Sequence, residues 1–590
     1  MKRRTARSAV IVALAVLLFG GARARAASWW RLPLWGAEVK VFAIDPFEAD
    51  HLYCGTSRGN FYGSTDGGAT WTPLRQGAAF PGFIATGLIA DSKAPGRLWA
   101  SLAGQYQGGL VVRSDDGGAN WTVLARWRTS VATRALALAP ARGDDPPLLA
   151  VGGDDGVRLS KDGGDTWTLT GDMTPGLYQV ESLAFAPDDP DTLYAGTWRQ
   201  AFRTRNGGRT WSRIAEGMVL DASVYSWDFA PADSKDIWVS TCGWVYRTPD
   251  GGDHWTRIKT GFTNRRSHNV RRDPKRPGVV YAGTVGGLHR STDGGETFSR
   301  ISRETLVVTA MEVDRRSGRL YVGTEGEGVF FSDDGGMTLS SGSVGLAEGR
   351  VSDLVADPKD PSRLFFFRAY AGGESGVWEA KGMQVRRLSL DPLPPAAALG
   401  AFVDPDGSTV LLLSSFSGVR ASYDGGERWV QPQGGPTGTP LALYATEFGA
   451  PVLVTTTGVF RTVDGRSFSM VSGSPTAPSS AELLSDGGST ILKVRTADGS
   501  YRWDGSAWDT RRRTLLAGGR FLEAYRGDPA PVPVRTPVRE VDGNLVWEEA
   551  GHRRAVKSPR PGLSIASTLA TPEGRLYVGT AGDGLFLFEP

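Results

Sequence analysis

One eight-residue pattern recurs along the chain and limits its possible folds more than any other feature. The pattern is Ser/Thr-x-Asp/Asn-Gly-Gly-x-x-aromatic, and its eight clear copies occupy 64–71, 114–121, 160–167, 204–211, 248–255, 291–298, 332–339 (where Leu339 replaces the aromatic residue) and 422–429. Successive copies start 41 to 50 residues apart, except for one interval of 90. Such a period is typical of repeat architectures in which each unit is one small supersecondary structure.

Each repeat unit contains four short runs of β-forming residues. In the clearest unit these runs lie at 182–186, 192–197, 201–203 and 211–214, and Pro, Asp and Gly separate them. No stretch between the runs is long enough for a helix. The sequence therefore predicts four antiparallel strands per unit, called A to D here, with the eight-residue pattern in the turn between C and D.

This turn, which we call the box, has the composition of a structural device. Its Asp carboxylate and Ser/Thr hydroxyl can hydrogen-bond to backbone groups of the turn, and its Gly pair accepts positive φ angles. The aromatic residue is expected to pack into the interior of its own sheet. We therefore expect no box Asp to be catalytic.

The repeat resembles the Asp-box, or BNR, repeat of β-propellers, and the resemblance covers nearly the whole mature chain. Families with this repeat include sialidases, xyloglucanase-type glycoside hydrolases, the sortilin luminal domain and photosystem II assembly factors. The density of boxes is most similar to the last three. The resemblance implies sheets arranged radially as blades. It also implies binding or glycoside hydrolysis as the function, with catalytic aspartates facing a cleft between two propellers in the xyloglucanase-type enzymes.

Counting units gives thirteen four-stranded blades, so the predicted fold is all-β. One ring usually holds about four to eight blades, which favours tandem β-propellers of seven plus six. The predicted domains are 27–345, with the boxes, and 346–590, with degenerate boxes. The chain crosses between them near 340–350 or near Ala380, in a unit that has lost its box. A single very wide ring is the alternative.

The two ends of the chain predict how the last blade is completed. The final unit, 564–588, stops after strand C, and the segment 29–34 resembles D strands such as 71–74. We expect the N-terminal strand to complete this blade, because an open sheet edge invites aggregation.

The first 26 residues have the features of a secretory signal peptide. A basic start is followed by an apolar run at 9–19 and by Ala24-Arg25-Ala26, so cleavage is expected after Ala26 and the protein is expected to be secreted or periplasmic. The pair Arg3-Arg4 keeps twin-arginine export open as an alternative. No later segment is apolar enough for a membrane span.

Composition argues against several partners and cofactors. Removal of the leader, which holds six Lys/Arg and no acid, leaves 60 basic and 63 acidic residues and a net charge of −3, which gives no reason to expect nucleic acid. Two cysteines and five histidines without an HExxH motif predict no metal site, and no cofactor is expected. Cys54 and Cys242 fall in blades that are not neighbours, so a disulfide between them is not expected.

Candidate binding residues lie in the B–C and D–A loops, which share the face opposite the boxes. Exposed aromatic and charged residues there suit a peptide or sugar, although each could be an ordinary loop residue. The candidates are Tyr106, Trp198 and Arg199 in B–C loops and Tyr225, Trp227, Arg265 and Arg266 in D–A loops. The basic cluster 265–276 parallels the arginine-rich patch with which photosystem II assembly factors are thought to hold a protein. A solvated face split over both ends of strand A is the other interpretation.

A glycosidase needs two carboxylates on either side of the scissile bond. Two B–C loops and one hairpin turn offer candidates, which are Asp154, Asp155, Glu325, Glu327 and Asp498. Asp498 is equally explained as a plain Asp-Gly turn. A sialidase is less favoured, because Arg31 matches the Arg-Ile-Pro motif of such enzymes but the further arginines of their site have no match.

The sequence favours an exported, non-catalytic scaffold that binds a protein or peptide on its loop face. The alternative is a glycoside hydrolase that acts on a polysaccharide in a cleft between the propellers. Two carboxylates converging on an aromatic-lined cleft would favour the hydrolase.

Overall fold

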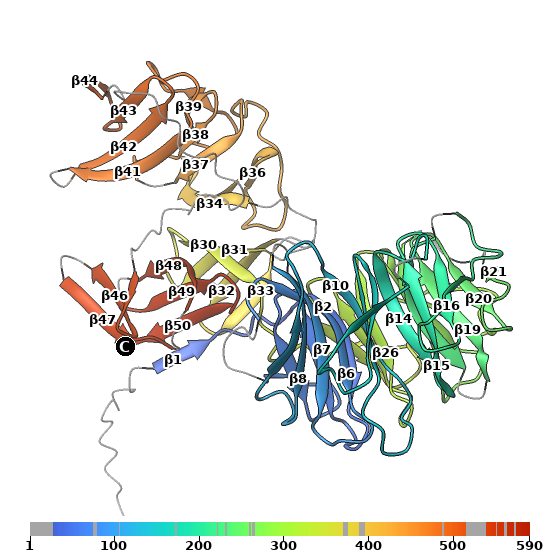
Figure 1. Ribbon diagram of the computed structural model, residues 1–590. Helices are drawn as coiled ribbons and strands as arrows, with labels where there is room; N and C mark the ends of the chain where they lie inside the picture. The colour runs from blue at the N-terminus through green and yellow to red at the C-terminus, as the bar shows by residue number, and fades with distance from the viewer. Residues whose placement is uncertain are drawn as a thin grey trace, which may run out of the picture.

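The computed structural model consists of antiparallel β-sheets (Figure 1). It describes residues 28–590 apart from 75–79, 105–106, 172–173, 221, 231–232, 259–260, 262–265, 370–375, 389–395, 446, 487–488, 515–537, 550–551, 560–562 and 572–573. Every regular element in these ranges is a strand, and the strands form thirteen sheets. The predicted all-β propeller fold is confirmed, although two of the sheets have three strands rather than four.

Seven four-stranded blades form the first ring, each running from strand A to strand D. Their strands are β2 (Val39–Ile44), β3 (Leu52–Thr56), β4 (Phe61–Ser64) and β5 (Thr72–Pro73) in blade 1; β6 (Phe83–Ala90), β7 (Leu98–Gly104), β8 (Gly108–Ser114) and β9 (Thr122–Arg126) in blade 2; β10 (Thr133–Leu138), β11 (Leu149–Gly153), β12 (Gly156–Ser160) and β13 (Thr168–Thr170) in blade 3; β14 (Val180–Ala186), β15 (Asp189–Thr197), β16 (Ala201–Thr204) and β17 (Ser212–Arg213) in blade 4; β18 (Val224–Ala230), β19 (Asp233–Thr241), β20 (Val245–Thr248) and β21 (Thr256–Arg257) in blade 5; β22 (Ser267–Arg272), β23 (Val280–Thr284), β24 (Gly287–Ser291) and β25 (Ser299–Arg300) in blade 6; and β26 (Val308–Val313), β27 (Leu320–Thr324), β28 (Val329–Ser332) and β29 (Ser340–Ser341) in blade 7.

The first ring closes on itself. Strand β26 of blade 7 packs beside β2 of blade 1, and Thr309 Oγ1 donates a hydrogen bond of 2.6 Å to the Val39 carbonyl. This closure after seven blades contradicts the alternative of one very wide ring.

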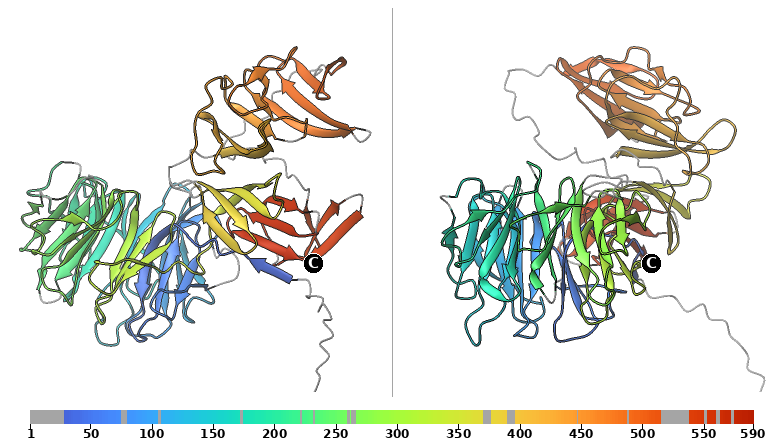
Figure 2. Two further views of the ribbon diagram at one scale, coloured as in Figure 1. Left: turned by 180° about the vertical axis from the view of Figure 1, so that it is seen from behind. Right: turned by 90° about the vertical axis from the view of Figure 1, so that its right-hand side faces the viewer.

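Six sheets form the second set. Their strands are β30 (Arg350–Ala356), β31 (Arg363–Ala369), β32 (Gly376–Lys381) and β33 (Gln384–Arg387) in blade 8; β34 (Ala396–Val403), β35 (Thr409–Ser415) and β36 (Gly418–Ser422) in blade 9; β37 (Pro440–Tyr444), β38 (Val452–Thr455), β39 (Gly458–Arg461) and β40 (Ser469–Met470) in blade 10; β41 (Ser480–Asp486), β42 (Ser489–Thr496), β43 (Gly499–Trp503) and β44 (Trp508–Thr514) in blade 11; β45 (Arg539–Val541), β46 (Asn544–Glu549) and β47 (His552–Lys557) in blade 12; and β48 (Ile565–Ala570), β49 (Leu576–Thr580) and β50 (Leu585–Glu589), joined by β1 (Ser28–Arg31), in blade 13. Blade 13 packs against blade 8, and Figures 1 and 2 show blades 9 to 11 rising from blade 8.

The N-terminal strand completes blade 13 as predicted. Strand β1 pairs antiparallel with β50, from Ser28 opposite Glu589 to Arg31 opposite Phe586. The chain then passes into β2 of the first ring and returns to the second set between β29 and β30. Ala380, the other proposed crossing point, lies inside β32.

Hydrogen bonds between loops join the first ring to blade 13. Arg58 Nη1, from the B–C loop of blade 1, donates a hydrogen bond of 2.6 Å to the Ala581 carbonyl in the B–C loop of blade 13. Arg31 donates bonds to the carbonyls of Asp583 (2.8 Å) and Ala347 (3.2 Å). The two loop faces therefore meet at this junction.

Each of the eight clear boxes has the predicted turn geometry. The second Gly of every box donates its N–H to the hydroxyl of the leading Ser or Thr, at 2.7 to 3.0 Å. In the first box, Ser64 Oγ also donates to Asp66 Oδ1 (2.8 Å), and that oxygen accepts the Thr70 N–H (2.9 Å). Both Gly residues of this box have positive φ angles, 69° and 84°. The box is thus a turn between strands C and D that is stabilised by hydrogen bonds within the box itself.

The box aromatic residue packs between blades, which corrects the expectation that it fills the interior of its own sheet. Trp255 of blade 5 donates from Nε1 to the Ile214 carbonyl of blade 4 (2.7 Å), and Trp211 of blade 4 donates to Thr170 Oγ1 of blade 3 (2.9 Å). Trp71 of blade 1 donates to the Gly342 carbonyl beyond blade 7 (2.7 Å). The aromatic residue therefore seals the junction to the preceding blade.

The hydrophobic core follows the same arrangement. The B strands β3, β11, β23, β27 and β49 are buried at every residue, because each lies inside a blade that has neighbours on both sides. Individual clusters span adjacent blades, such as the one that joins Ala150 of blade 3 to Phe202 of blade 4. Cys54 is buried in this core and Cys242 is half-buried, and the two do not form a disulfide.

The proposed signal peptide, 1–26, lies outside the described residues. Within the described ranges, no helix is long and apolar enough to cross a membrane.

Candidate functional site

Every A strand of the first ring carries a β-bulge near its start. One residue of each strand is left out of the pairing register with strand B, and a bulge of this kind redirects a side chain. The seven bulged residues all line one cavity of about 460 Å³ in the middle of the ring. We call them the bulge layer, which consists of Lys40, Thr86, Arg134, Glu181, Tyr225, His268 and Thr309.

Arg134 forms hydrogen bonds with two acidic residues, Glu181 in the bulge layer and Asp154 in the adjacent B–C loop. Its Nε donates to Asp154 Oδ1 and its Nη1 donates to Glu181 Oε1, both at 2.7 Å. Burial raises the pKa of Glu181, and the charge of Arg134 opposes that rise only in part. Lys40 is paired with Glu38 at 2.6 Å. The layer is therefore polar and carries charges of both signs.

Tyr225 and His268 form an aromatic pair in neighbouring blades, with ring centroids 6.2 Å apart. His268 Nδ1 lies 2.8 Å from the Val308 carbonyl, which can only accept, so Nδ1 carries the proton and Nε2 is an acceptor. Burial lowers the pKa of His268 and raises the pKa of Tyr225, so both side chains are neutral at pH 7. They add uncharged hydrogen-bonding groups to the cavity.

A second ring of residues surrounds the cavity on the loop face. The first residue of a B–C loop donates its N–H to the carbonyl of the residue that precedes strand A. This bond recurs for Asp154 to Ala132 (3.2 Å), Trp198 to Gln179 (3.1 Å), Cys242 to Ser223 (3.2 Å) and Glu325 to Val307 (3.1 Å). Asp154, Trp198 and Glu325 are therefore equivalent positions of the repeat, all near the mouth of the cavity.

The predicted carboxylates are engaged by other groups rather than gathered as one pair. Besides Arg134, Asp154 accepts the Ala132 N–H (2.8 Å). Asp155 pairs with both terminal nitrogens of Arg158, which lowers its pKa, and Glu327 pairs with Arg303. Asp498 accepts hydrogen bonds from Thr496 and Tyr501 within its hairpin, in blade 11 of the second set. Glu325 is half-buried at the rim.

Two predicted aromatic residues lie in a strand instead of a loop. Tyr225 and Trp227 both belong to β18, because the connection from blade 4 ends at residue 223. Tyr225 faces the cavity through its bulge, whereas Trp227 is buried and donates from Nε1 to Ser182 Oγ (2.9 Å). Trp227 nevertheless also lines the cavity.

Trp198 and Arg199 are exposed in their B–C loop, as expected, and Arg266 is exposed before β22. Tyr106 and Arg265 lie outside the described residues. The side chains of Tyr178, Trp198 and Leu220 are 48%, 51% and 78% exposed. Hydrogen bonds from Trp198 N–H to Gln179 and from Ser223 Oγ to the Trp198 carbonyl join the loops that carry them. We call these three residues the apolar rim.

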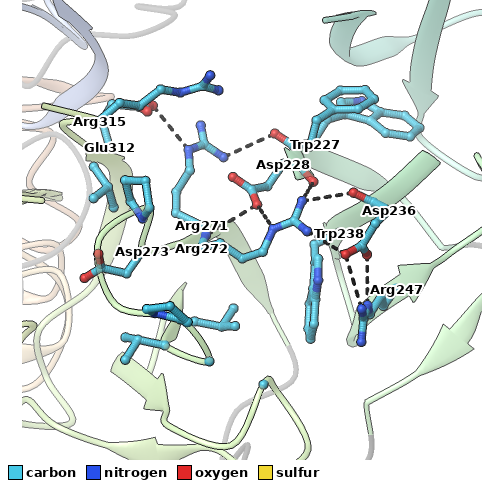
Figure 3. Close-up of a pocket in the computed structure, with 18 residues that line it drawn as sticks. Trp227, Asp228, Asp236, Trp238, Arg247, Arg271, Arg272, Asp273, Glu312 and Arg315 are labelled. Atoms are coloured by element: carbon cyan, nitrogen blue, oxygen red, sulfur yellow. Dashed lines mark hydrogen bonds and ion pairs between the residues drawn. The ribbon is translucent and has the colours of Figure 1, made fainter. Parts of the chain in front are cut away.

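The basic cluster 265–276 does not form one patch. Arg266 lies on the loop face, whereas Arg276 on the box face bonds to Asp273 (2.8 Å) and to the Asp333 carbonyl (2.6 Å). Arg271 and Arg272 lie between blades 5, 6 and 7, among acidic residues (Figure 3). The arrangement agrees with the interpretation of a cluster split over both ends of strand A.

Most of the bulge layer was not among the predicted site residues. Only Tyr225 was named, although alignment of the units on their B strands places all seven residues in one column. Charged, hydroxyl and aromatic residues all occur in that column, and this variation within an otherwise regular repeat is the sequence feature that could have identified the site. No group of three or more His, Cys, Asp or Glu side chains in the described ranges could hold a metal ion.

Comparison with known proteins supports the fold and leaves the function open. No protein-family model and no curated protein sequence matches the chain. The GH74 xyloglucanase from Xanthomonas campestris is similar over 96% of this chain and 100% of its own, at 16% identity and a TM-score of 0.56. A GH74 enzyme from Niastella koreensis covers 95% of this chain and 99% of its own, at 16% identity and a TM-score of 0.53. These likenesses show a shared β-propeller fold, and a fold alone does not fix an activity.

Proposed function

We propose that this chain is an exported, non-catalytic β-propeller protein that binds a peptide or a protein segment on the loop face of its first ring. The observation that carries the proposal is the apolar rim beside a polar cavity. Tyr178, Trp198 and Leu220 expose large apolar surfaces, which is costly in water unless a partner covers them. The bulge layer below offers both donors and acceptors, as the backbone and side chains of a peptide require.

The engaged carboxylates favour binding over hydrolysis. A glycosidase needs one carboxyl that stays protonated and a second that is free to act as base or nucleophile. Asp155 has a lowered pKa beside Arg158, and Asp154 and Glu327 each form an ion pair with an arginine. These contacts oppose both roles. The glycoside hydrolase is therefore the alternative, and the experiment below includes it.

Three further proposals accompany this function. The boxes are Asp boxes of the BNR kind, since their hydrogen bonds support the resemblance in sequence. The chain divides into propeller domains at 27–345 and 346–590, except that β1 belongs with the second. Export depends on a signal peptide cleaved after Ala26.

A random peptide display library tests the function. We expect selected peptides to bind the wild-type protein and to lose about tenfold or more in affinity for Trp198→Ser, since an aromatic anchor contributes about 2 kcal/mol. The matched control is Phe416→Ser, an exposed aromatic residue in a B–C loop of the second set. In parallel, release of reducing ends from xyloglucan is measured. Hydrolysis that Asp154→Asn abolishes, with no peptide selected, would establish the alternative.

A further inference from the structure

A second cavity, of about 440 Å³, lies on the box face of the first ring between blades 5, 6 and 7 (Figure 3). It is lined by the far ends of the A strands β18, β22 and β26 and by the turns beyond them. Trp227, Arg271 and Glu312 line both this cavity and the one that holds the bulge layer. The ion pair of Arg271 with Glu312, 3.2 Å between Nε and Oε2, therefore lies where the two cavities adjoin.

The residues of this cavity depart from the repeat. Pairing with the B strands places Asp228, Arg271 and Glu312 in one column of the repeat. The same column holds Ala43, Ile89, Ala137 and Ala184 in the other four blades. Arg272 likewise occupies a column that is apolar elsewhere in the ring. Four blades therefore fold with an apolar residue in the first of these columns, so the fold itself does not require a charge there. Burying charged side chains at this position in the other three blades costs free energy.

Ion pairs satisfy most of these charges. Arg272 bridges Asp228 Oδ2 (2.7 Å) and Asp236 Oδ2 (2.9 Å), and Arg247 holds Asp236 from the other side (2.9 Å). Figure 3 shows Arg271 between Glu312 and Asp228. Within the part of the chain that the structure describes, Arg271 Nη2 donates no hydrogen bond, although Nε and Nη1 do.

The cavity has an excess of positive charge. Its lining contains four arginines and four acids, but Asp273 is already held by Arg276 (2.8 Å) and by the Tyr281 hydroxyl (2.8 Å). Arg315, exposed at the rim, has no hydrogen-bond or ion-pair partner among the described residues. Without Asp273, the four arginines and the three other acids of the lining leave one net positive charge. The rest of the wall is apolar and includes Phe229, Trp238, Pro274 and Pro277.

We propose that this box-face cavity binds a small organic carboxylate with an apolar body. The carboxylate would lie between Arg315 and the open Nη2 of Arg271, and the apolar body against Phe229 and the two prolines. A volume of about 440 Å³ is large enough for such a molecule. This site is separate from the peptide surface proposed above, because it opens on the opposite face and carries its own charge.

Calorimetric titration with phenylacetate tests the proposal, and phenylacetamide serves as the neutral probe of the same shape. We expect saturable binding of phenylacetate with a Kd of about 1 mM or tighter, and no saturable binding of the amide. Arg315→Gln should weaken binding about threefold or more. Arg271→Lys should weaken it about tenfold, because lysine keeps the charge and loses the planar fork. The matched control is Arg209→Gln, an exposed arginine in the box of blade 4.

Binding that Arg315→Gln and Arg271→Lys weaken while Arg209→Gln leaves it unchanged supports the site. The proposal is overturned if phenylacetate shows no saturation up to about 10 mM, or if the amide binds equally well. Equal affinities of the wild type and Arg315→Gln would also overturn it, since the ligand would then bind elsewhere. Because Arg315 is exposed and has no hydrogen-bond or ion-pair partner among the described residues, we expect its replacement to leave folding intact. A loss of binding in this variant then reports on the ligand site rather than on stability.

Discussion

At the scale of single residues, the two glycines of the box in blade 6 have different roles. Both have positive φ angles, 78° for Gly294 and 91° for Gly295. A Cβ atom on Gly294 would meet nothing within 4 Å, whereas one on Gly295 would lie 2.0 Å from the Trp238 ring of blade 5. The first glycine therefore serves the turn, and the second also serves the close approach of two blades.

Alanine substitutions separate these roles. We expect Gly294→Ala to cost about 1 kcal/mol, from the left-handed backbone alone. Gly295→Ala should cost about 3 kcal/mol, because overpacking against Trp238 adds to the same backbone term. Chemical denaturation of both variants measures the difference, and equal losses of stability would contradict this account of the blade junction.

The box aspartates predict how stability depends on pH. Hydrogen bonds from the Thr338 N–H and hydroxyl lower the pKa of Asp334 to about 2, and the same bonds recur in other boxes. A carboxyl whose pKa is depressed by folding stabilises the protein above its unfolded pKa and loses that contribution as the pH falls through its folded value. The boxes should therefore lose this stabilisation between about pH 4 and pH 2.

Asp334→Asn tests this dependence, and blade 4 shows that Asn fits the turn. Asn206 there donates to Thr210 Oγ1 at 2.8 Å and accepts the Thr210 N–H at 2.9 Å. We expect the variant to unfold at a lower temperature than the wild type at pH 7, because it lacks the charged acceptor. The difference should vanish near pH 2. A difference that stays constant between these pH values would contradict the assignment.

At the scale of elements, the A-strand bulges turn a uniform repeat into a site. The same structural position carries Lys40, Arg134, Glu181, Tyr225 and His268, so the ring acquires a varied cavity without any change in its blades. In the second set, the A-strand bulges leave out Ala397, Leu441 and Ala566, and the wider irregularity of β30 leaves out Asp353 and Leu354. The bulge residue is therefore polar in all seven blades of the first ring, whereas apolar residues predominate at the bulges of the second set.

Strand β1 is the element that joins the two ends of the chain. Trp29 packs against Phe588, with ring centroids 5.2 Å apart, and donates from Nε1 to the Lys557 carbonyl (2.7 Å). Deletion of residues 1–31 should destabilise blade 13 by about 2 kcal/mol, from the loss of one large half-buried side chain. It should also expose the edge of β50 and cause association that rises with concentration.

Light scattering after gel filtration measures this association, and a chain that begins at residue 28 is the control. A deletion variant that stays monomeric and as stable as the control would contradict the closing role of β1.

Local chemistry explains why much of the fold could be predicted. The Ser-Asp-Gly-Gly turn needs only its own backbone, and the N-terminal segment resembles D strands such as 71–74 in sequence. The residues of the site are less predictable from the sequence, because a bulge depends on how its strand pairs with the neighbouring strand. Tyr225 and Trp227 stand two residues apart and both line the cavity, yet the bulge leaves Tyr225 partly exposed while Trp227 is buried. The packing of the box aromatic residues is unpredictable for a similar reason, because the residues that surround them belong to the preceding blade.

At the scale of the whole molecule, the two faces of the first ring have different roles. One face carries the boxes, which hold each blade to its neighbour through groups such as Trp255 and Gly295. The other carries the loops, the apolar rim and the mouth of the polar cavity. Contacts of Arg31 and Arg58 tie this loop face to blade 13. A partner on the loop face could therefore also contact the second set, which widens the proposed binding surface.

The most direct test of the central claim is hydrogen–deuterium exchange of the wild-type protein, alone and with a peptide selected from the display library. If the boxes build the ring and the loop face binds, the peptide should slow exchange at loop-face amides such as Trp198 and Gln179, while the box amides, such as Gly252 and Gly295, stay unchanged. Slowed exchange concentrated at the box turns, with the loops unaffected, would contradict the account.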